Sequence, residues 1–298
     1  MSVQDDLWFD ASKCFIGGEW VAPVGGQTLG LENPSDGSEI ARIARGQRGD
    51  VDAAVLAAQS ALAGEWGRKT AVERGRILTR IGQLVLERVD VLARLEAADV
   101  GKPLKQARAD AVALARYMEF YGGAADKIHG ATIPYLDGYT VYTLREPHGV
   151  TAHIVPWNYP MQIIGRSVGA ALAMGNAAVL KPAEEACLTA LAFAKIAEEA
   201  GLPAGALNVV PGLGEEAGAA LSSHPHINHI SFTGSVGVGS LIQKAAADAI
   251  VPVTLELGGK SPQIVFDDAD LDAALPFLVN AGVQNAGQTC SASSRILM

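Results

Sequence analysis

The sequence predicts an α/β fold in which a parallel β-sheet is covered by helices on both faces. From Val150 onward, short apolar segments that suit β-strands alternate with longer segments that suit helices, which is the pattern of repeated β-α units. The apolar segments are continuous, as is typical of strands buried on both faces. They occupy residues 150–155, 177–182, 206–212, 228–234 and 253–259. Right-handed crossovers between them would give a Rossmann-like sheet.

The residues before position 130 predict four helices after a short extended start. Side chains that can accept hydrogen bonds from a first helical turn stand at the expected starts of three of these helices, namely Asp50, Thr70 and Asp90. Thr70 gives the strongest signal, because Glu73 completes a capping box. We expect the fourth helix over residues 104–121, ended by Gly122 and Gly123.

Residues 129–147 have a different character, because aromatic and β-branched residues lie on both sides of Asp137-Gly138. An Asp-Gly pair between such segments predicts a β-hairpin. No neighbouring segment is expected to cover this hairpin, which would suit a projecting arm that pairs with another subunit. A surface hairpin that packs on its own domain fits the sequence about as well.

Composition narrows the class of protein. The chain has 298 residues and a net charge of −9, with no run of Lys or Arg able to follow a phosphate backbone, so nucleic acid is not expected as a partner. Acidic residues at positions 5 and 6 stand where a secretory signal needs positive charge. No stretch has the ~18 consecutive apolar residues of a membrane span. We expect neither export nor membrane insertion.

Three cysteines are too few and too scattered for a disulfide framework or a Cys-x-x-Cys metal site, namely Cys14, Cys187 and Cys290. This usage predicts a reducing cytoplasm, with Cys14 and Cys187 as small buried hydrophobes. Three histidines also lie close together in the sequence, namely His224, His226 and His229. They lack the i, i+4 placement of helical ligands and no acid or cysteine joins them, so we expect no metal.

Polar and glycine-rich segments follow each of the five predicted strands. In order they read PWNYP, KPAEE, PGLG, FTGSVGVG and ELGGK, and a sixth segment, NAGQTC, ends at Cys290. Ligands of doubly wound sheets bind at the carboxyl ends of the strands, so these segments form the candidate site. In this order, and over nearly the whole chain, they resemble the aldehyde dehydrogenase superfamily. The resemblance implies an oxidoreductase that oxidises an aldehyde to a carboxylic acid with NAD.

The resemblance assigns the chemistry to three residues. Cys290 would add as a thiolate to the aldehyde carbonyl, giving a hemithioacetal that can lose hydride and leave a thioester. The side-chain amide of Asn158 and the backbone N–H of Cys290 would stabilise the oxyanion, while Glu256 would be the general base that activates water. Each residue also has a structural alternative. Glu256 would then be a solvated rim residue, Asn158 a turn former and Cys290 an inert hydrophobe.

The glycine pattern for the cofactor departs from the usual dinucleotide motif, because Gly234, Gly237 and Gly239 are spaced G-x-x-G-x-G. In the family variant that this pattern resembles, Gly234, Ser235 and Val236 lie where a helix N-terminus meets the pyrophosphate. Val236 stands where threonine is commoner, which removes a possible hydroxyl contact.

A second pair of residues resembles the one that holds the adenosine ribose in this family. Lys181 and Glu184 form this pair, and a carboxylate there repels a 2′-phosphate, so NAD is expected and NADP is not. The alternative for the pair is an exposed polar turn after a strand. The remaining expected cofactor contacts are Pro156, Trp157, Gly214 and Leu257.

Two other functions stay open at this point. A CoA-acylating aldehyde dehydrogenase would pass the acyl group to CoA, and Glu256 argues against it because a retained base speeds hydrolysis. A non-catalytic nucleotide-binding fragment would keep the fold without the chemistry. We expect Tyr159, Met161 and Gln162 to contribute to the pocket, where an aromatic lining would suit a cationic amino- or betaine-type aldehyde.

These expectations divide the chain into an NAD-binding domain over residues 1–128 and 148–258, an oligomerisation hairpin over 129–147 and the beginning of a catalytic domain over 259–298. The hairpin predicts a homo-oligomer, a dimer or a tetramer. A new apolar strand ends at Met298, eight residues past Cys290. We therefore expect a truncated or divided chain that is poorly soluble or inactive alone, because its sheet would expose an unpaired edge.

Overall fold

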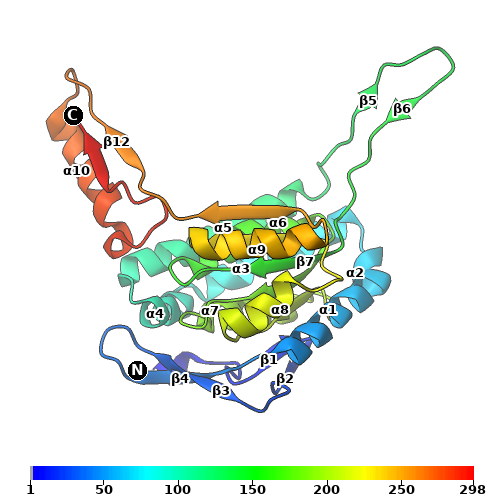
Figure 1. Ribbon diagram of the computed structural model, residues 1–298, viewed down its shortest axis with the longest axis horizontal. Helices are drawn as coiled ribbons and strands as arrows, with labels where there is room; N and C mark the ends of the chain where they lie inside the picture. Colours follow the sequence, from blue (N-terminus) through cyan, green and yellow to red (C-terminus); the bar gives the residue numbers. More distant parts are fainter. Residues whose placement is uncertain (1–2) are drawn as a thin grey trace.

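The computed structural model describes residues 3–298 and has an α/β fold built on a seven-stranded sheet (Figure 1). Five of the strands are parallel, namely β7 (Val150–Ile154), β8 (Ala177–Lys181), β9 (Leu207–Val209), β10 (His229–Gly234) and β11 (Val253–Leu257). Their order along the sheet is β11-β10-β7-β8-β9, so the winding reverses between β7 and β10. The predicted parallel sheet is confirmed, and each strand lies inside the segment predicted for it.

The first strands of the chain close one edge of this sheet. β1 (Cys14–Ile16) and β2 (Glu19–Val21) form a hairpin, and β1 pairs antiparallel with β9 where Phe15 faces Val209. A separate antiparallel ribbon consists of β3 (Thr28–Glu32) and β4 (Glu39–Ala44), after a short 3-10 helix, η1 (Val3–Asp6). The sequence indicated only an extended start here, because three-residue strands pair through contacts far along the chain.

Helices cover both faces of the sheet (Figure 1). One face carries α6 (Pro160–Ala173) and α7 (Leu188–Glu199), and the other carries α1 (Arg48–Ala63), α8 (Ala219–Ser222) and α9 (Val236–Asp248). An outer layer packs on α6 and α7, namely α3 (Ala71–Glu87), α4 (Val89–Val100) and α5 (Leu104–Ala124). Two short connecting helices are α2 (Glu65–Arg68) and η2 (Gly214–Gly218). Buried apolar side chains between these layers form one continuous core.

The helix starts agree with the sequence at one of the three predicted caps. Thr70 caps α3 as predicted, and the Glu73 carboxylate accepts a hydrogen bond from the backbone N–H of Thr70 at 2.8 Å. The prediction at Asp50 is wrong, because α1 begins at Arg48 and Asp50 lies in its first turn. The Asp50 carboxylate accepts from the backbone N–H groups of Gln47 and Val24, both at 2.9 Å. The prediction at Asp90 is also wrong, since α4 already begins at residue 89.

The predicted end of the fourth helix is wrong as well, because α5 continues through Gly122 and Gly123 to Ala124. Gly122 serves helix packing instead. A Cβ atom placed on Gly75 of α3 would lie 2.4 Å from the carbonyl oxygen of Gly122, so the two helices touch through their backbones. A glycine in a helical segment can therefore indicate a close contact between two helices as well as the end of a helix.

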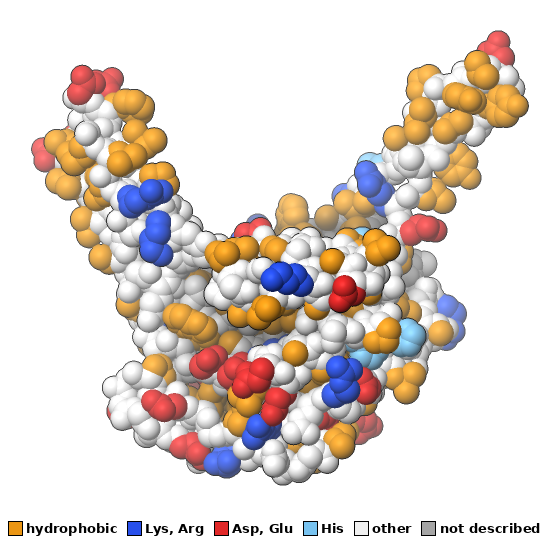
Figure 2. Space-filling model, in the orientation of Figure 1, with side chains coloured by type: hydrophobic (Ala, Val, Ile, Leu, Met, Phe, Trp, Pro, Cys, Tyr) orange, Lys and Arg blue, Asp and Glu red, His pale blue; other side chains and the backbone are white. Residues whose placement is uncertain are grey.

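Two segments project from the body (Figure 1). The first is the hairpin of β5 (Thr132–Ile133) and β6 (Val141–Tyr142), turning at Gly138 in the left-handed region. Almost all its side chains are exposed, so the alternative of a hairpin packed on its own domain is wrong. Large apolar side chains gather along it (Figure 2), namely Tyr135, Leu136, Tyr139, Tyr142 and Leu144.

The second projection is formed by the last part of the chain. It pairs β12 (Pro262–Ile264) in parallel with β13 (Arg295–Leu297), joined by α10 (Leu271–Val283) and η3 (Gln284–Gly287). The apolar strand predicted at residues 295–298 is confirmed by β13. No residue of α10 is buried, and hydrophobic side chains cover much of this projection (Figure 2). Within residues 3–298, no helix combines the length and the apolar content of a membrane span.

Candidate active site

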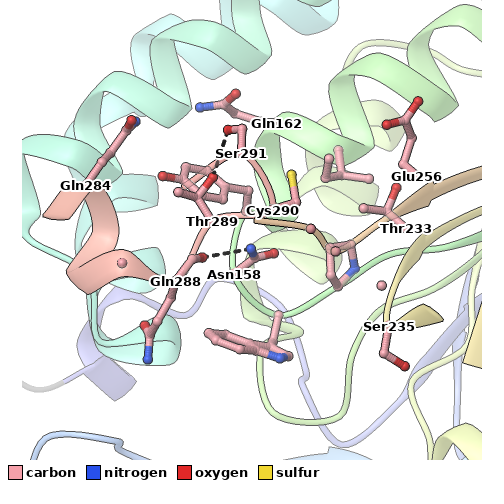
Figure 3. Close-up of a pocket in the computed structure, with 18 of the residues that line it drawn as sticks. Asn158, Gln162, Thr233, Ser235, Glu256, Gln284, Gln288, Thr289, Cys290 and Ser291 are labelled. Carbon is pink, nitrogen blue, oxygen red and sulfur yellow. Dashed lines mark hydrogen bonds between the residues drawn. The ribbon is translucent and has the colours of Figure 1, made fainter. Parts of the chain in front are cut away.

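The reversal point of the sheet carries a cavity of about 410 Å³ (Figure 3). Its walls come from the segments that follow β7, β10 and β11 and from the loop before β13. Ligands of doubly wound sheets bind at this switch point, where neighbouring crossovers run to opposite faces. All three predicted catalytic residues line this cavity, namely Asn158, Glu256 and Cys290.

Asn158 ties the end of β7 to the loop that carries Cys290. Its side-chain nitrogen donates to the carbonyl oxygen of Gln288 at 2.8 Å, as the dashed line in Figure 3 shows. From the loop side, Asn285 donates to the backbone oxygens of both Asn158 and Gln288, each at 3.3 Å. A primary amide has two N–H donors, so one donor of Asn158 is left for a ligand in the cavity.

The loop before Cys290 has an unusual backbone. Asn285, Ala286 and Gly287 have φ angles of +51°, +56° and +77°, a left-handed run that is costly for residues with a Cβ atom. Such conformations persist where the surroundings enforce them and are concentrated at functional sites. Here the run turns the chain so that the sulfur of Cys290 enters the cavity, with Asn158 and Glu256 on different sides of it in Figure 3.

The three cysteines differ sharply in their surroundings. Cys290 is exposed, whereas Cys14 and Cys187 are buried thiols, as predicted. Burial, with a smaller contribution from Asp50, raises the pKa of Cys14 to about 12. Burial also raises the pKa of Cys187 well above its ordinary value. Because the thiolate is the reactive form, the two buried cysteines are unreactive near neutral pH.

The predicted pyrophosphate site borders the same cavity. Gly234 and Ser235 line it at the N-terminus of α9, and the Ser235 hydroxyl accepts from the backbone N–H of Val238 at 3.3 Å. Val236 is exposed at the first helical position, outside the cavity lining. Leu257 is also outside the lining and packs on α9, where a Cβ on Gly239 would lie 2.7 Å from it. The helix N-terminus is thus held close to β11.

The predicted ribose residues form their own cluster. The Lys181 ammonium lies 2.6 Å from one Glu184 oxygen, and the other oxygen accepts from the backbone N–H of Gly214 at 3.2 Å. Burial opposes ionisation of Glu184, but Lys181 and backbone N–H groups, including that of Gly214, together outweigh it, and the pKa of Glu184 is lowered. Glu184 lines a neighbouring cavity of about 620 Å³, and Trp157 and Gln288 line both cavities. Pro156 lines the first cavity only.

A buried charge cluster under the cavity wall was not predicted. Lys102 is fully buried and contacts the carboxylates of Glu96 at 2.7 Å and Asp110 at 2.6 Å. Its ammonium also lies 4.2 Å from the centre of the Tyr159 ring, and Asp110 accepts from the Gln162 side chain at 2.6 Å. Burial, opposed by Lys102, raises the pKa of Glu96 to about 7. Two residues of the cavity wall, Tyr159 and Gln162, are thus held by this cluster.

The three clustered histidines do not converge on a common point. His224 accepts from the backbone N–H of His226 and lies 3.4 Å from Asp52, while His229 bonds to the hydroxyl of Thr254 at 3.1 Å. In the part of the chain that the structure describes, no group of three or more His, Cys, Asp or Glu side chains is arranged to hold a metal ion.

Comparisons with known proteins identify the family of the chain. A sequence model of the aldehyde dehydrogenase family matches residues 20–298. The chain belongs to the aldehyde dehydrogenase family. The predicted resemblance is therefore confirmed.

Two curated relatives of the chain illustrate the match. Hydroxyisobutyraldehyde dehydrogenase of Mycolicibacterium austroafricanum is 46% identical over 284 residues, which cover 95% of this chain and 56% of the relative. Retinal dehydrogenase 2 of Homo sapiens is 43% identical over 291 residues, covering 96% of this chain and 56% of the relative. The chain thus spans little more than half the length of these relatives.

Solved structures show the same fold. A provisionally named aldehyde dehydrogenase from Burkholderia cenocepacia is 66% identical with a TM-score of 0.94, covering 95% of this chain and 60% of that one. An NAD+ complex of an aldehyde dehydrogenase from Bacillus cereus is 43% identical with a TM-score of 0.96, covering 99% of this chain and 60% of that one.

Proposed function

We propose that the protein oxidises an aldehyde to a carboxylic acid with NAD, using Cys290 as the nucleophile. The observation that carries the proposal is the meeting of Cys290, Asn158 and Glu256 around one cavity beside the N-terminus of α9. Membership of the aldehyde dehydrogenase family and the NAD+ complex of the Bacillus cereus relative support the same chemistry.

Cys290, Asn158 and Glu256 each have a role in the proposed oxidation of the aldehyde. The Cys290 thiolate bonds to the carbonyl carbon, and the resulting oxyanion receives hydrogen bonds from the free N–H of Asn158 and the backbone N–H of Cys290. NAD supplies the hydride acceptor. Loss of hydride from the hemithioacetal leaves a thioester on Cys290. Glu256 takes a proton from water as the water attacks this thioester, which releases the acid and restores the thiol.

The cofactor would lie across the strand ends. The N-terminus of α9 offers its first-turn N–H groups to the pyrophosphate beside Gly234 and Ser235. Glu184, kept ionised by Lys181, would accept hydrogen bonds from both ribose hydroxyls and repel a 2′-phosphate. We therefore assign NAD to this site, with residues 1–128 and 148–258 as its binding domain and residues 259–298 as the beginning of the catalytic domain.

The projecting hairpin suggests self-association. Residues 129–147 expose a row of large apolar side chains on an arm that projects from the body (Figure 1). A second copy of the chain would cover them and pair the free strand edges, so we assign a homo-oligomer. Three free thiols suit a reducing compartment such as the cytoplasm.

Two measurements test the proposed chemistry on the protein itself. Iodoacetamide should modify Cys290, and an aldehyde should slow this modification by occupying the sulfur. Calorimetry should show NAD binding that Glu184→Ala weakens by roughly tenfold or more and that Glu19→Ala, at an exposed position on β2, leaves unchanged. Failure of both the aldehyde protection and the NAD binding would contradict the proposal. Release of acyl-CoA in place of acid would favour the CoA-acylating alternative.

A further inference from the structure

We propose that Arg166 makes the active-site cavity selective for aldehydes that carry an anionic group, such as a carboxylate, at their far end. This inference rests on the proposed function and specifies its substrate class. Arg166 lies on α6, one helical turn after Gln162, and like Gln162 it lines the cavity that contains Cys290. The substrate would then be bound at two points, with its aldehyde carbon at Cys290 and its anionic group at Arg166.

Arg166 stands at a junction of two cavities. The catalytic cavity adjoins a second cavity of about 450 Å³, and both are lined by Arg166, Ile163, Thr233 and Glu256. The second cavity runs along polar side chains of β10 and β11, including Ser231 and Thr254. A molecule that enters toward Cys290 from this side therefore passes the guanidinium.

The charge of Arg166 is not neutralised by an ion pair within residues 3–298. Its side chain has no hydrogen bond or ion pair with any residue from 3 to 298, and it is exposed. By contrast, some arginines of the chain are held in ion pairs, as when Arg45 contacts Glu216 at 2.6 Å and Arg94 contacts Asp6 at 2.6 Å. A free guanidinium has five N–H donors in a fork that matches a carboxylate.

The other charges of the cavity leave an excess of positive charge. Its cations are Arg166 and Lys260, and its anion is Glu256. With Cys290 as a neutral thiol, two cations and one anion give a local charge of +1 in a chain whose net charge is −9, and the thiolate would balance this charge. An anionic substrate would be repelled by Glu256 alone, and the two cations offset this repulsion.

The structure argues against the cationic substrate that the sequence suggested. The expected aromatic contact was Tyr159, but its ring already faces the ammonium of Lys102 at 4.2 Å and the residue is only 8% exposed. Tyr159 is therefore an internal partner of the buried charge cluster. The cations of the cavity outnumber its one anion, Glu256, which disfavours a quaternary ammonium group and leaves Trp157 as the exposed aromatic ring of the lining.

The test uses two alkylating probes that are similar in size but differ in charge. Iodoacetate is anionic and iodoacetamide is neutral, so the ratio of their rates at Cys290, measured by mass spectrometry of the peptide, reports the local field around the sulfur. The variants are Arg166→Gln, Arg166→Lys and a control, Arg68→Gln, which removes an exposed arginine at the end of α2.

We expect Arg166→Gln to lower the iodoacetate-to-iodoacetamide ratio by roughly tenfold, which corresponds to about 1.4 kcal/mol. Arg166→Lys should keep most of the ratio, the control should keep all of it, and added salt should reduce it in the wild type. An unchanged ratio in Arg166→Gln, or an equal loss in the control, would overturn the inference.

A second measurement compares two aldehydes as protecting agents against iodoacetamide. 4-Oxobutanoate carries a carboxylate and butanal does not. We expect 4-oxobutanoate to protect Cys290 at lower concentration than butanal, and Arg166→Gln to remove this difference while butanal still protects. Equal protection by both aldehydes in the wild type would refute the selectivity but leave the proposed nucleophile intact. Loss of protection by both would instead refute the proposed function.

Discussion

Replacement of Lys102 by methionine measures how much the buried charge cluster under the active site contributes to the stability of the fold. Lys102 is completely buried, as are the two carboxylates it contacts, Glu96 and Asp110. Methionine preserves most of the length and apolar surface of the side chain but removes the charge. The variant therefore leaves two carboxyl groups in the interior without their cation, and it removes the partner of the Tyr159 ring.

The expected loss follows from these contacts. At an effective dielectric constant of ~20, unit charges ~4 Å apart attract by about 4 kcal/mol, and Lys102 makes two such contacts. Desolvation offsets part of this attraction, and removal of one partner of a buried ion pair lowers the free energy of unfolding by about 3–5 kcal/mol. We expect a loss in this range at pH 8.

The pH dependence gives a more specific signature. Because the pKa of Glu96 is about 7 in the fold, above its unfolded value, the fold holds a proton between pH 5 and 7 that the unfolded chain releases. Without Lys102, which lowers the pKa of Glu96, this buried carboxyl group should take up a proton more readily. The loss caused by Lys102→Met should therefore shrink between pH 8 and pH 5.

Urea unfolding followed by tryptophan fluorescence measures these free energies. The matched control is Lys105→Met, which removes an exposed lysine three residues later, in the first turn of α5, and should change stability by less than about 0.5 kcal/mol. A loss below about 1 kcal/mol for Lys102→Met, or a loss that does not vary with pH, would refute the reasoning.

Four further predictions follow from other contacts. Gly75→Ala should lower the free energy of unfolding by about 1–3 kcal/mol, since its Cβ would lie 2.4 Å from a backbone oxygen of α5, whereas Gly123→Ala, with open space, should raise it by up to about 1 kcal/mol. Because burial lowers the pKa of His153 to about 3, acid titration should show stability falling by up to about 1.4 kcal/mol per pH unit below pH 6.5, and His153→Gln should flatten this slope. A disulfide reagent should titrate one thiol, Cys290, in the folded protein and all three after denaturation, and two fast thiols in the folded protein would contradict the burial assigned to the others. Asn158→Ala should slow aldehyde oxidation by roughly 10²–10³-fold in steady-state assays, and an unchanged rate would exclude it as an oxyanion donor.

The parts of the fold that the sequence predicted are those fixed by local pattern. Three of the parallel strands, β7, β8 and β9, are almost fully buried, so each is an apolar run that can be recognised without its neighbours. The expectation of burial on both faces is wrong for β11, where exposed and half-buried residues alternate. The capping box at Thr70 is also local. By contrast, the addition of β1 to the edge of β9 and the passage of α5 through Gly122 depend on segments that meet only in three dimensions.

In the candidate site, too, residues in local motifs could be predicted, whereas residues that act through three-dimensional contacts could not. Cys290, Asn158 and Glu256 were assigned from ordered motifs, and the structure brings them to one cavity. Lys102 escaped notice because a lysine between helices normally reads as solvated surface, and only its burial shows otherwise. Arg166 could have been predicted to line the pocket, because it follows the predicted pocket residue Gln162 by one helical turn.

The most direct test of the central claim is to trap the acyl group on Cys290. The Glu256→Gln variant keeps the nucleophile but lacks the base proposed for hydrolysis, so incubation with an aldehyde and NAD should leave a thioester. Mass spectrometry should then show the peptide containing Cys290 heavier by one acyl group, in amounts that match the NADH formed and that hydroxylamine removes. NADH formation without an adduct at Cys290, or the same adduct in the Cys290→Ser variant, would contradict the account.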